Sequence, residues 1–155
     1  MWQQKMLDLD QTKQDILAIL NHVKMRDMSV PRRHGIGGAH NQIEFAQYKG
    51  TEYQVEKETP HPVVPGVSII QYRMYKANRD GSINVGNPQA KIFTKTVYDP
   101  SVWTDEKLVK AAVEAAMDAA NKDNFKREWS GNTAEGYPIM GYQEKGKITT
   151  FFFSE

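Results

Sequence analysis

The fold is decided by residues 104–120, TDEKLVKAAVEAAMDAA, because this stretch carries the strongest helical pattern in the chain. Thr104 is a suitable N-cap, and Asp105 and Glu106 are favoured near the positive N-terminal end of a helix. Apolar residues at helical spacing predict a buried stripe of Leu108, Val109, Ala112, Val113, Ala116, Met117 and Ala120. The many alanines in this stripe would allow the helix to lie close to a sheet.

Three strand-like segments follow this helix, at residues 125–129, 137–143 and 147–153. Glu144-Lys145-Gly146, between the last two segments, predicts a hairpin turn. A period of two in the last segment places Ile148, Thr150 and Phe152 on one face, opposite Thr149, Phe151 and Phe153. The three consecutive phenylalanines favour burial on both faces.

The chain before this helix divides into a helical N-terminal part and a β-rich middle. Residues 9–23 predict a helix that starts near Asp10 or Thr12 and buries Ile16, Leu17, Ile19, Leu20 and Val23. Residues 41–48 suit a short helix that stops at Gly50. Strands are predicted at residues 53–57, 67–76 and 91–98, with a turn at residues 78–81. The predicted fold is therefore α+β: a single domain, 1–155, with N-terminal helices, antiparallel sheets, one long central helix and a C-terminal β-hairpin.

Composition bounds the function. The chain has 155 residues, 39% of them hydrophobic and 25% charged, as in ordinary globular domains. It has no cysteine, which excludes a disulfide framework, a thiolate zinc site and a cysteine nucleophile. The net charge of +1 excludes a protein that coats nucleic acid through its overall charge, but allows a local basic patch. No apolar run is long enough for a membrane span, and Met1-Trp2-Gln3-Gln4-Lys5 leads into a charged amphipathic stretch, which predicts no signal peptide.

Two of the four histidines, His34 and His40, lie in one glycine-rich stretch at residues 34–41. Glycines allow close backbone approach to a ligand and can expose amide groups to an anion. Because histidine gains and loses a proton near neutral pH, two histidines in one mobile loop predict acid–base catalysis. The alternative is a surface loop with two solvated histidines.

A local excess of positive charge precedes this stretch. Lys24, Arg26, Arg32 and Arg33 are opposed nearby in the sequence only by Asp27. Such a group could hold phosphates beside the histidines, or it could be a solvated charged face.

Metal chemistry has weak support in the sequence. There is no His-Glu-x-x-His pair, no carboxylate cluster and no phosphate-binding loop of the Gly-Lys-Ser/Thr type. A metal-dependent nuclease using His34, His40 and His61 remains an alternative, which a chelator would test.

Three blocks, at residues 37–45, 95–107 and 129–152, occur in an order that resembles bacterial EndoU-type endoribonucleases. The first, GGAHNQIEF, is similar to the segment that bears the family's second catalytic histidine. The second, KTVYDPSVWTDEK, resembles the strand of the catalytic lysine and the helix after it. The third, from Trp129-Ser130-Gly131 to Gly146-Lys147-Ile148-Thr149-Thr150-Phe151-Phe152, is similar to the terminal hairpin.

The resemblance implies a fold of the barnase–EndoU–colicin–RelE type, with a helical segment at 1–33 and a catalytic core at 34–155. It implies catalytic roles for His40, Lys95 and Thr150 and substrate contacts for Thr96, Phe152 and Arg33. Met25 lies near the place of the family's first histidine, so His34 or His22 would have to substitute, and His34 is favoured because it shares the glycine-rich stretch. Phe152 stands where the family has a tyrosine, and Lys91 is the alternative cation.

The implied function is an endoribonuclease toxin that needs no metal or cofactor. One imidazole would remove the proton of the ribose 2′-OH and another would protonate the leaving 5′-oxygen, leaving a 2′,3′-cyclic phosphate. Lys95 would stabilise the charge on the phosphoryl oxygens, unless its ammonium merely reaches water at a sheet edge. Such domains belong to polymorphic or contact-dependent inhibition systems, act in the target-cell cytoplasm, often on tRNA, and are neutralised by a cognate immunity protein. The alternative is a catalytically weakened EndoU-like module that binds RNA or a protein.

Overall fold

The computed structural model describes residues 7–155, so Met1-Trp2-Gln3-Gln4-Lys5 and the leader prediction made on them lie outside the described residues. The chain forms two compact units, one of Lys24–Val102 and one that combines the chain up to Val23 with Trp103–Glu155. Both contain helices and antiparallel strands, which confirms the α+β prediction. The elements are α1 (Leu9–Lys24), a 3-10 turn (Arg32–His34), α2 (Gln42–Ala46), β1 (Tyr53–Pro60), β2 (Val67–Ala77), β3 (Ile83–Pro88), β4 (Phe93–Tyr98), α3 (Asp105–Asn121), β5 (Glu128–Asn132), β6 (Pro138–Glu144) and β7 (Lys147–Phe153).

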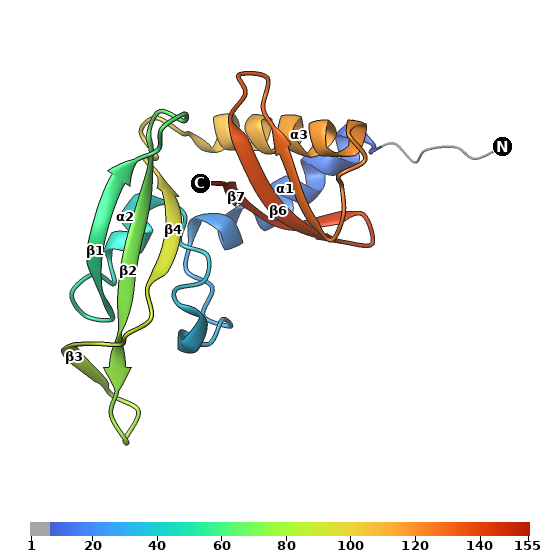
Figure 1. The fold of residues 1–155 in the computed structure, drawn as a ribbon. Helices are drawn as coiled ribbons and strands as arrows, with labels where there is room; N and C mark the ends of the chain where they lie inside the picture. Colours follow the sequence, from blue (N-terminus) through green and yellow to red (C-terminus); the bar gives the residue numbers. More distant parts are fainter. Residues whose placement is uncertain (1–6) are drawn as a thin grey trace. The chain divides into compact units, whose positions relative to one another are not determined.

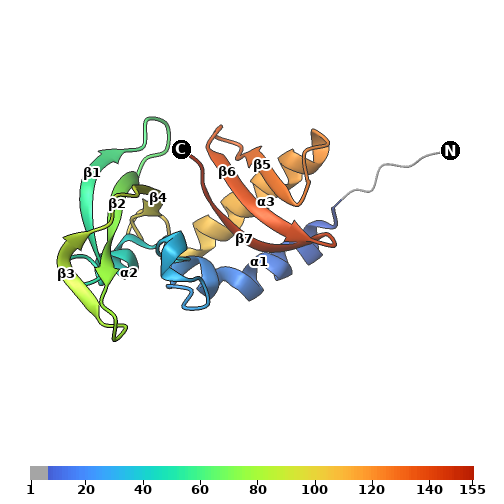
Figure 2. The ribbon, with the colours of Figure 1, turned by 60° about the horizontal axis from the view of Figure 1, so that its bottom comes forward.

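The Lys24–Val102 unit is built on an antiparallel sheet in which β2 is central. β1 pairs with one edge of β2, and β4 and β3 pair with successive parts of the other edge. The short helix α2 lies against this sheet (Figures 1 and 2). Asn41 caps α2, since its side chain accepts hydrogen bonds from the backbone of Ile43 and Glu44.

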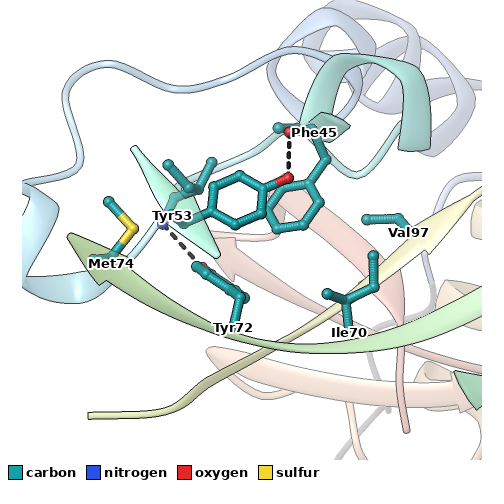
Figure 3. Close-up of a cluster of buried hydrophobic side chains, with 8 residues drawn as sticks. Phe45, Tyr53, Ile70, Tyr72, Met74 and Val97 are labelled. Carbon is teal, nitrogen blue, oxygen red and sulfur yellow. Dashed lines mark hydrogen bonds between the residues drawn. The ribbon is translucent and has the colours of Figure 1, made fainter. Parts of the chain in front are cut away.

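An aromatic core joins α2 to this sheet (Figure 3). The rings of Phe45 and Tyr53 stack with centroids 4.5 Å apart, and Tyr53 donates a hydrogen bond to the carbonyl of Phe45 at 2.6 Å. Tyr72 accepts a bond from the backbone N–H of Ile36 at 3.0 Å. Ile36 and Ala39, both from the glycine-rich stretch, belong to the same buried cluster. The core therefore fixes this stretch to the sheet.

The other unit is built on the antiparallel sheet β5-β6-β7, with α3 packed on one face (Figure 1). Thr104 caps α3 as predicted, accepting a hydrogen bond from the backbone of Lys107. At Gly131 a β-carbon would lie 2.0 Å from the carbonyl oxygen of Ala115, so only glycine fits there. The predicted close approach of an alanine-rich helix to a sheet is confirmed.

The buried faces of two helices differ from the predicted ones. On α3 the small residues dominate, and Val113, Met117 and Ala120 are only partly buried. The fully buried set is Leu108, Val109, Ala111, Ala112, Ala115, Ala116 and Ala119. On α1 the predicted core residue Leu17 is 52% exposed. On α3, close packing against the sheet selects the face with the smallest side chains, which a hydrophobic period alone does not identify.

The terminal hairpin has its predicted turn, since Lys145 and Gly146 both adopt positive φ, 54° and 85°. The predicted faces of β7 are confirmed for Thr150 to Phe153 but are wrong for Ile148 and Thr149. Pairing shifts between Tyr142↔Thr150 and Gln143↔Ile148, so one residue of β7 bulges. Ile148 therefore shares the buried face with Phe151 and Phe153, and Thr150 and Phe152 are partly exposed.

Two further strands depart from prediction. β5 starts at Glu128 instead of residue 125, because Asp123 has a positive φ of 55° and Asn124 bonds to the carbonyl of Ser130. β3 was not predicted from its sequence, INVGNP, which is rich in residues that disfavour strands. It pairs with β2 at only two positions, Tyr75↔Pro88 and Ala77↔Ile83.

Candidate active site

The glycine-rich stretch is anchored by backbone hydrogen bonds on both sides. On one side Ala39 donates to the carbonyl of Met25 at 2.7 Å, and Asp27 donates to that of Gly37 at 2.9 Å. On the other side Tyr98 of β4 donates to the carbonyl of His40 at 2.8 Å. The alternative of two solvated histidines holds for His34, which is exposed, but not for His40, whose ring contacts β4. The end of the stretch pairs with β4, where Asn41 forms a parallel bridge with Tyr98.

His40 is held in a defined tautomer. Its Nδ1 lies 2.9 Å from the carbonyl oxygen of Thr96. Because a carbonyl can only accept, Nδ1 carries the hydrogen and Nε2 keeps its lone pair. Burial, and then the positive charge of Lys95, lower the pKa of His40 to about 3. The imidazole is therefore neutral at neutral pH, the state that can accept a proton.

Lys95 lies on β4 with only 8% of its surface exposed. Its Nζ donates to the carbonyl of Gly38 at 2.6 Å and lies 5.9 Å from the centre of the Phe45 ring. Burial lowers the pKa of Lys95 to about 7. The expectation of an ammonium that reaches water at a sheet edge is wrong, because this ammonium is buried against the glycine-rich stretch.

The two side chains cross between the same two segments. Lys95 of β4 bonds to the backbone of Gly38, and His40 bonds to the backbone of Thr96 in β4. Each hydrogen bond therefore fixes a side chain of one segment to the backbone of the other segment. A neutral base beside a buried cation is suited to removing a proton near an anion.

The other site residues predicted in this unit lie outside the pair formed by His40 and Lys95. His34 and Arg33 are exposed on the 3-10 turn. Thr96 is buried, with 6% of its surface exposed, and its carbonyl serves His40. Lys91, the alternative cation, is exposed, with Nζ 4.7 Å from the centre of the Phe93 ring.

His61 has a local structural role that the sequence did not indicate. It is buried, and its Nδ1 accepts hydrogen bonds from the backbone of both Val63 and Val64 at 3.0 Å. These bonds hold the turn between β1 and β2 and occupy a lone pair that a metal would need. Over residues 7–155, no group of three or more potential metal-ligating side chains is present.

The basic residues before the glycine-rich stretch are partly neutralised by a residue that sequence analysis missed. Glu52 forms ion pairs with both Arg26 and Arg32. Asp27, the acid nearest in sequence, accepts hydrogen bonds from the backbone and the hydroxyl of Ser29. The interpretation of these arginines as phosphate ligands is therefore wrong for Arg26, whose side chain is 5% exposed.

The model of the bacterial EndoU nuclease family matches residues 21–154. The chain belongs to this family. The match covers the Lys24–Val102 unit, residues 21–23 and 103–154 of the other unit, and all the sequence-predicted site residues, His22 and His34 included. It confirms the prediction of an EndoU-type nuclease.

Two relatives of this EndoU chain carry the name tRNA nuclease CdiA. The protein from Escherichia coli (strain STEC_O31) is 35% identical over 88 residues, 55% of this chain and 3% of the relative. The protein from Yersinia mollaretii is 31% identical over 125 residues, 77% of this chain and 4% of the relative. The chain thus spans a small part of the length of these relatives. Among residues 7–155, no helix is long and apolar enough to cross a membrane.

The remaining predicted residues of the EndoU chain lie in the unit that contains the terminal hairpin. Thr150 and Phe152 are partly exposed on β7, where Thr150 lies opposite Tyr142 and Phe152 opposite Met140. Their predicted contacts with RNA stay predictions. His22 belongs to the same unit and is exposed on α1.

A pair of variants tests the source of a second imidazole. We expect His34→Ala to lower kcat by ~10²–10⁴-fold, the usual effect of losing a general acid or base. His22→Ala is the matched control, since both histidines are exposed and neither substitution removes a buried side chain. The rate of single-turnover RNA cleavage is measured for both variants. If His22→Ala loses activity and His34→Ala keeps it, the second imidazole is that of His22.

Proposed function

We propose that this EndoU domain cleaves RNA, with tRNA as the substrate class, by attack of a ribose 2′-OH on the adjacent phosphorus. The product carries a 2′,3′-cyclic phosphate, and the reaction needs neither metal nor cofactor. The crossed pair of His40 and Lys95 is the observation that supports this proposal most. The names of the two relatives support tRNA as the substrate.

His40 is the general base in this mechanism, because its imidazole is neutral and Nε2 is its acceptor. A base with a pKa of about 3 is weak in the free domain. Burial is the main cause of this low pKa, and a phosphodiester bound beside Lys95 offsets the second cause, the positive charge of Lys95. Substrate binding therefore raises the basicity of His40, and Lys95 stabilises the charge that develops on the phosphoryl oxygens.

The remaining steps are assigned to residues outside this pair. His34, or His22 in its place, protonates the leaving 5′-oxygen. Arg33 contacts a phosphate, and the chain around Thr96 contributes to the substrate surface. Thr150 donates a hydrogen bond to the RNA, and Phe152 stacks on a base. Residues 34–155 form the catalytic core of one nuclease domain, 1–155, a proposal supported by a family match that runs from residue 21 to residue 154.

The biological setting proposed is a toxin of a polymorphic or contact-dependent inhibition system. The domain would be delivered into a target cell, would act on RNA in its cytoplasm, and would be neutralised by a cognate immunity protein. The similarity to two CdiA proteins supports this setting.

An RNA- or protein-binding module without efficient catalysis is the alternative function. It is favoured by Phe152, whose ring can stack but cannot donate a hydrogen bond as the family's tyrosine would. Tight RNA binding without cleavage by the pure domain would support it.

The proposed chemistry predicts that cleavage continues in excess chelator. A tRNA pool is incubated with the pure domain and chelator, and the fragment ends are sequenced and tested for a cyclic phosphate. A matched RNA with 2′-deoxyribose at the cleaved position is expected to stay intact, because the attacking hydroxyl is missing. Loss of activity in chelator that a divalent ion restores would contradict the proposal.

A further inference from the structure

Glu52, just before β1, pairs with two arginines from the segment that precedes the glycine-rich stretch. Its Oε2 contacts Nη1 of Arg26, and its Oε1 lies 3.4 Å from Nε of Arg32. The side chains of Arg26, Glu52 and Arg32 are 5%, 16% and 27% exposed. A shielded carboxylate of this kind needs its partners, and removal of one partner leaves an uncompensated charge.

Both the side chain and the backbone of Arg26 have partners. Its guanidinium lies over the ring of Tyr48, 4.6 Å from the ring centre. Its backbone forms an antiparallel bridge with Gly38, and the flanking residues Met25 and Asp27 make the hydrogen bonds that hold the stretch. Gly38 is the residue whose carbonyl receives the ammonium of Lys95. A continuous set of contacts thus runs from Glu52 through Arg26 to the Lys95 contact.

Arg32 provides a second attachment for the same segment. Its Nη2 donates to the carbonyl oxygens of Tyr75, in β2, and of Glu52. The segment between the two arginines is therefore attached to the sheet at both ends through one carboxylate. His40 lies two residues beyond Gly38, so a shift of this segment changes its position too.

We propose that Glu52 is a positioning residue for the EndoU reaction. By holding Arg26 and Arg32, it keeps the glycine-rich stretch against β4, where His40 and Lys95 make their crossed hydrogen bonds. This inference rests on the proposed function for its kinetic consequences, although the geometry it describes can be measured without RNA.

The test compares Glu52→Gln with Glu56→Gln. Glu56 also pairs with an arginine, Arg73 at 2.9 Å, and its side chain is 32% exposed on β1. We expect Glu52→Gln to lower kcat at least tenfold per folded molecule with little change in KM, and Glu56→Gln to leave both unchanged. Glu52→Asp, which keeps the charge, is expected to restore part of kcat and serves if the glutamine variant does not fold.

A second measurement separates positioning from stability alone. In Glu52→Gln the looser stretch admits water to Lys95, so its pKa rises and the alkaline limb of the kcat/KM profile moves to higher pH. Nitrogen NMR shifts of the His40 ring and a titration of the Lys95 ammonium report the same change without RNA. Unchanged shifts, titration and kcat in a variant that is only less stable would overturn the positioning role. A wild-type domain that cleaves no RNA would instead overturn the proposed function, while the NMR comparison would still decide the role of Glu52.

Discussion

Replacement of His40 by alanine should lower the rate of RNA cleavage by ~10²–10⁴-fold, because the reaction loses its general base. His40→Asn is the sharper variant. An asparagine amide can keep a donor near the carbonyl of Thr96, which His40 Nδ1 contacts at 2.9 Å, but it supplies no base. Both variants should fold and be inactive. An unchanged rate of single-turnover cleavage in either variant would remove His40 from the mechanism.

The same variants should change how stability depends on acid. The pKa of His40 is about 3 in the folded chain and 6.5 in the unfolded chain, so only the unfolded chain gains this proton as the pH falls below 6.5. The wild type should therefore lose about 2–3 kcal/mol of stability from this site between about pH 7 and about pH 4.5. His40→Asn lacks this loss. Denaturant unfolding at the two pH values measures the difference between the curves.

The elements that could be predicted from sequence are those with local signals. The start of α3 follows from Thr104, whose side chain caps the helix, and the last hairpin follows from Lys145 and Gly146. The bulge in β7 has no such signal, because it depends on how Thr150 and Ile148 align with β6. Its effect was to move Ile148 to the other face, which alternation alone assigns wrongly.

The candidate site also combines features that the sequence indicates locally with features that depend on the folded chain. His40 and Lys95 could be selected from residue type and family resemblance. The hydrogen bonds that position them could not be predicted, because they join distant parts of the chain: Gly38 and Lys95 are 57 positions apart. Glu52 lies 26 positions from Arg26 and belongs to no motif, so its part in the arginine cluster was missed. Burial decides the protonation of His40 and Lys95, and burial is a property of the folded chain.

Lys95→Met is expected to stabilise the domain near neutral pH and to inactivate it. Folding buries this ammonium, and its pKa falls from 10.5 to about 7. Such a shift corresponds to a net cost of charging of about 5 kcal/mol below pH 7. Methionine has a similar length and carries no charge, so it should raise the midpoint of unfolding. Loss of a donor to the developing charge typically lowers kcat by ~10²–10³-fold.

The pH dependence of Lys95→Met distinguishes this account from simple repacking. Between the folded pKa of about 7 and the unfolded value of 10.5, the unfolded chain holds more protons, so wild-type stability rises with pH through this site. The gain should be about 2–3 kcal/mol between about pH 6 and about pH 9, and the variant should lack it. In activity, kcat/KM of the wild type should fall above about pH 7 as Lys95 loses its proton.

Two measurements complete the test of Lys95. Because its charge helps to lower the pKa of His40, the His40 pKa should rise in Lys95→Met, which an NMR titration detects. Lys91→Met is the matched control: Lys91 is exposed on the same stretch of chain, and its loss should leave kcat and stability unchanged. A Lys95→Met variant that is less stable yet fully active per folded molecule would show that Lys95 is not the catalytic cation. Lys91 would then be the next residue to test, because the reaction would still need a positive charge at the phosphoryl oxygens.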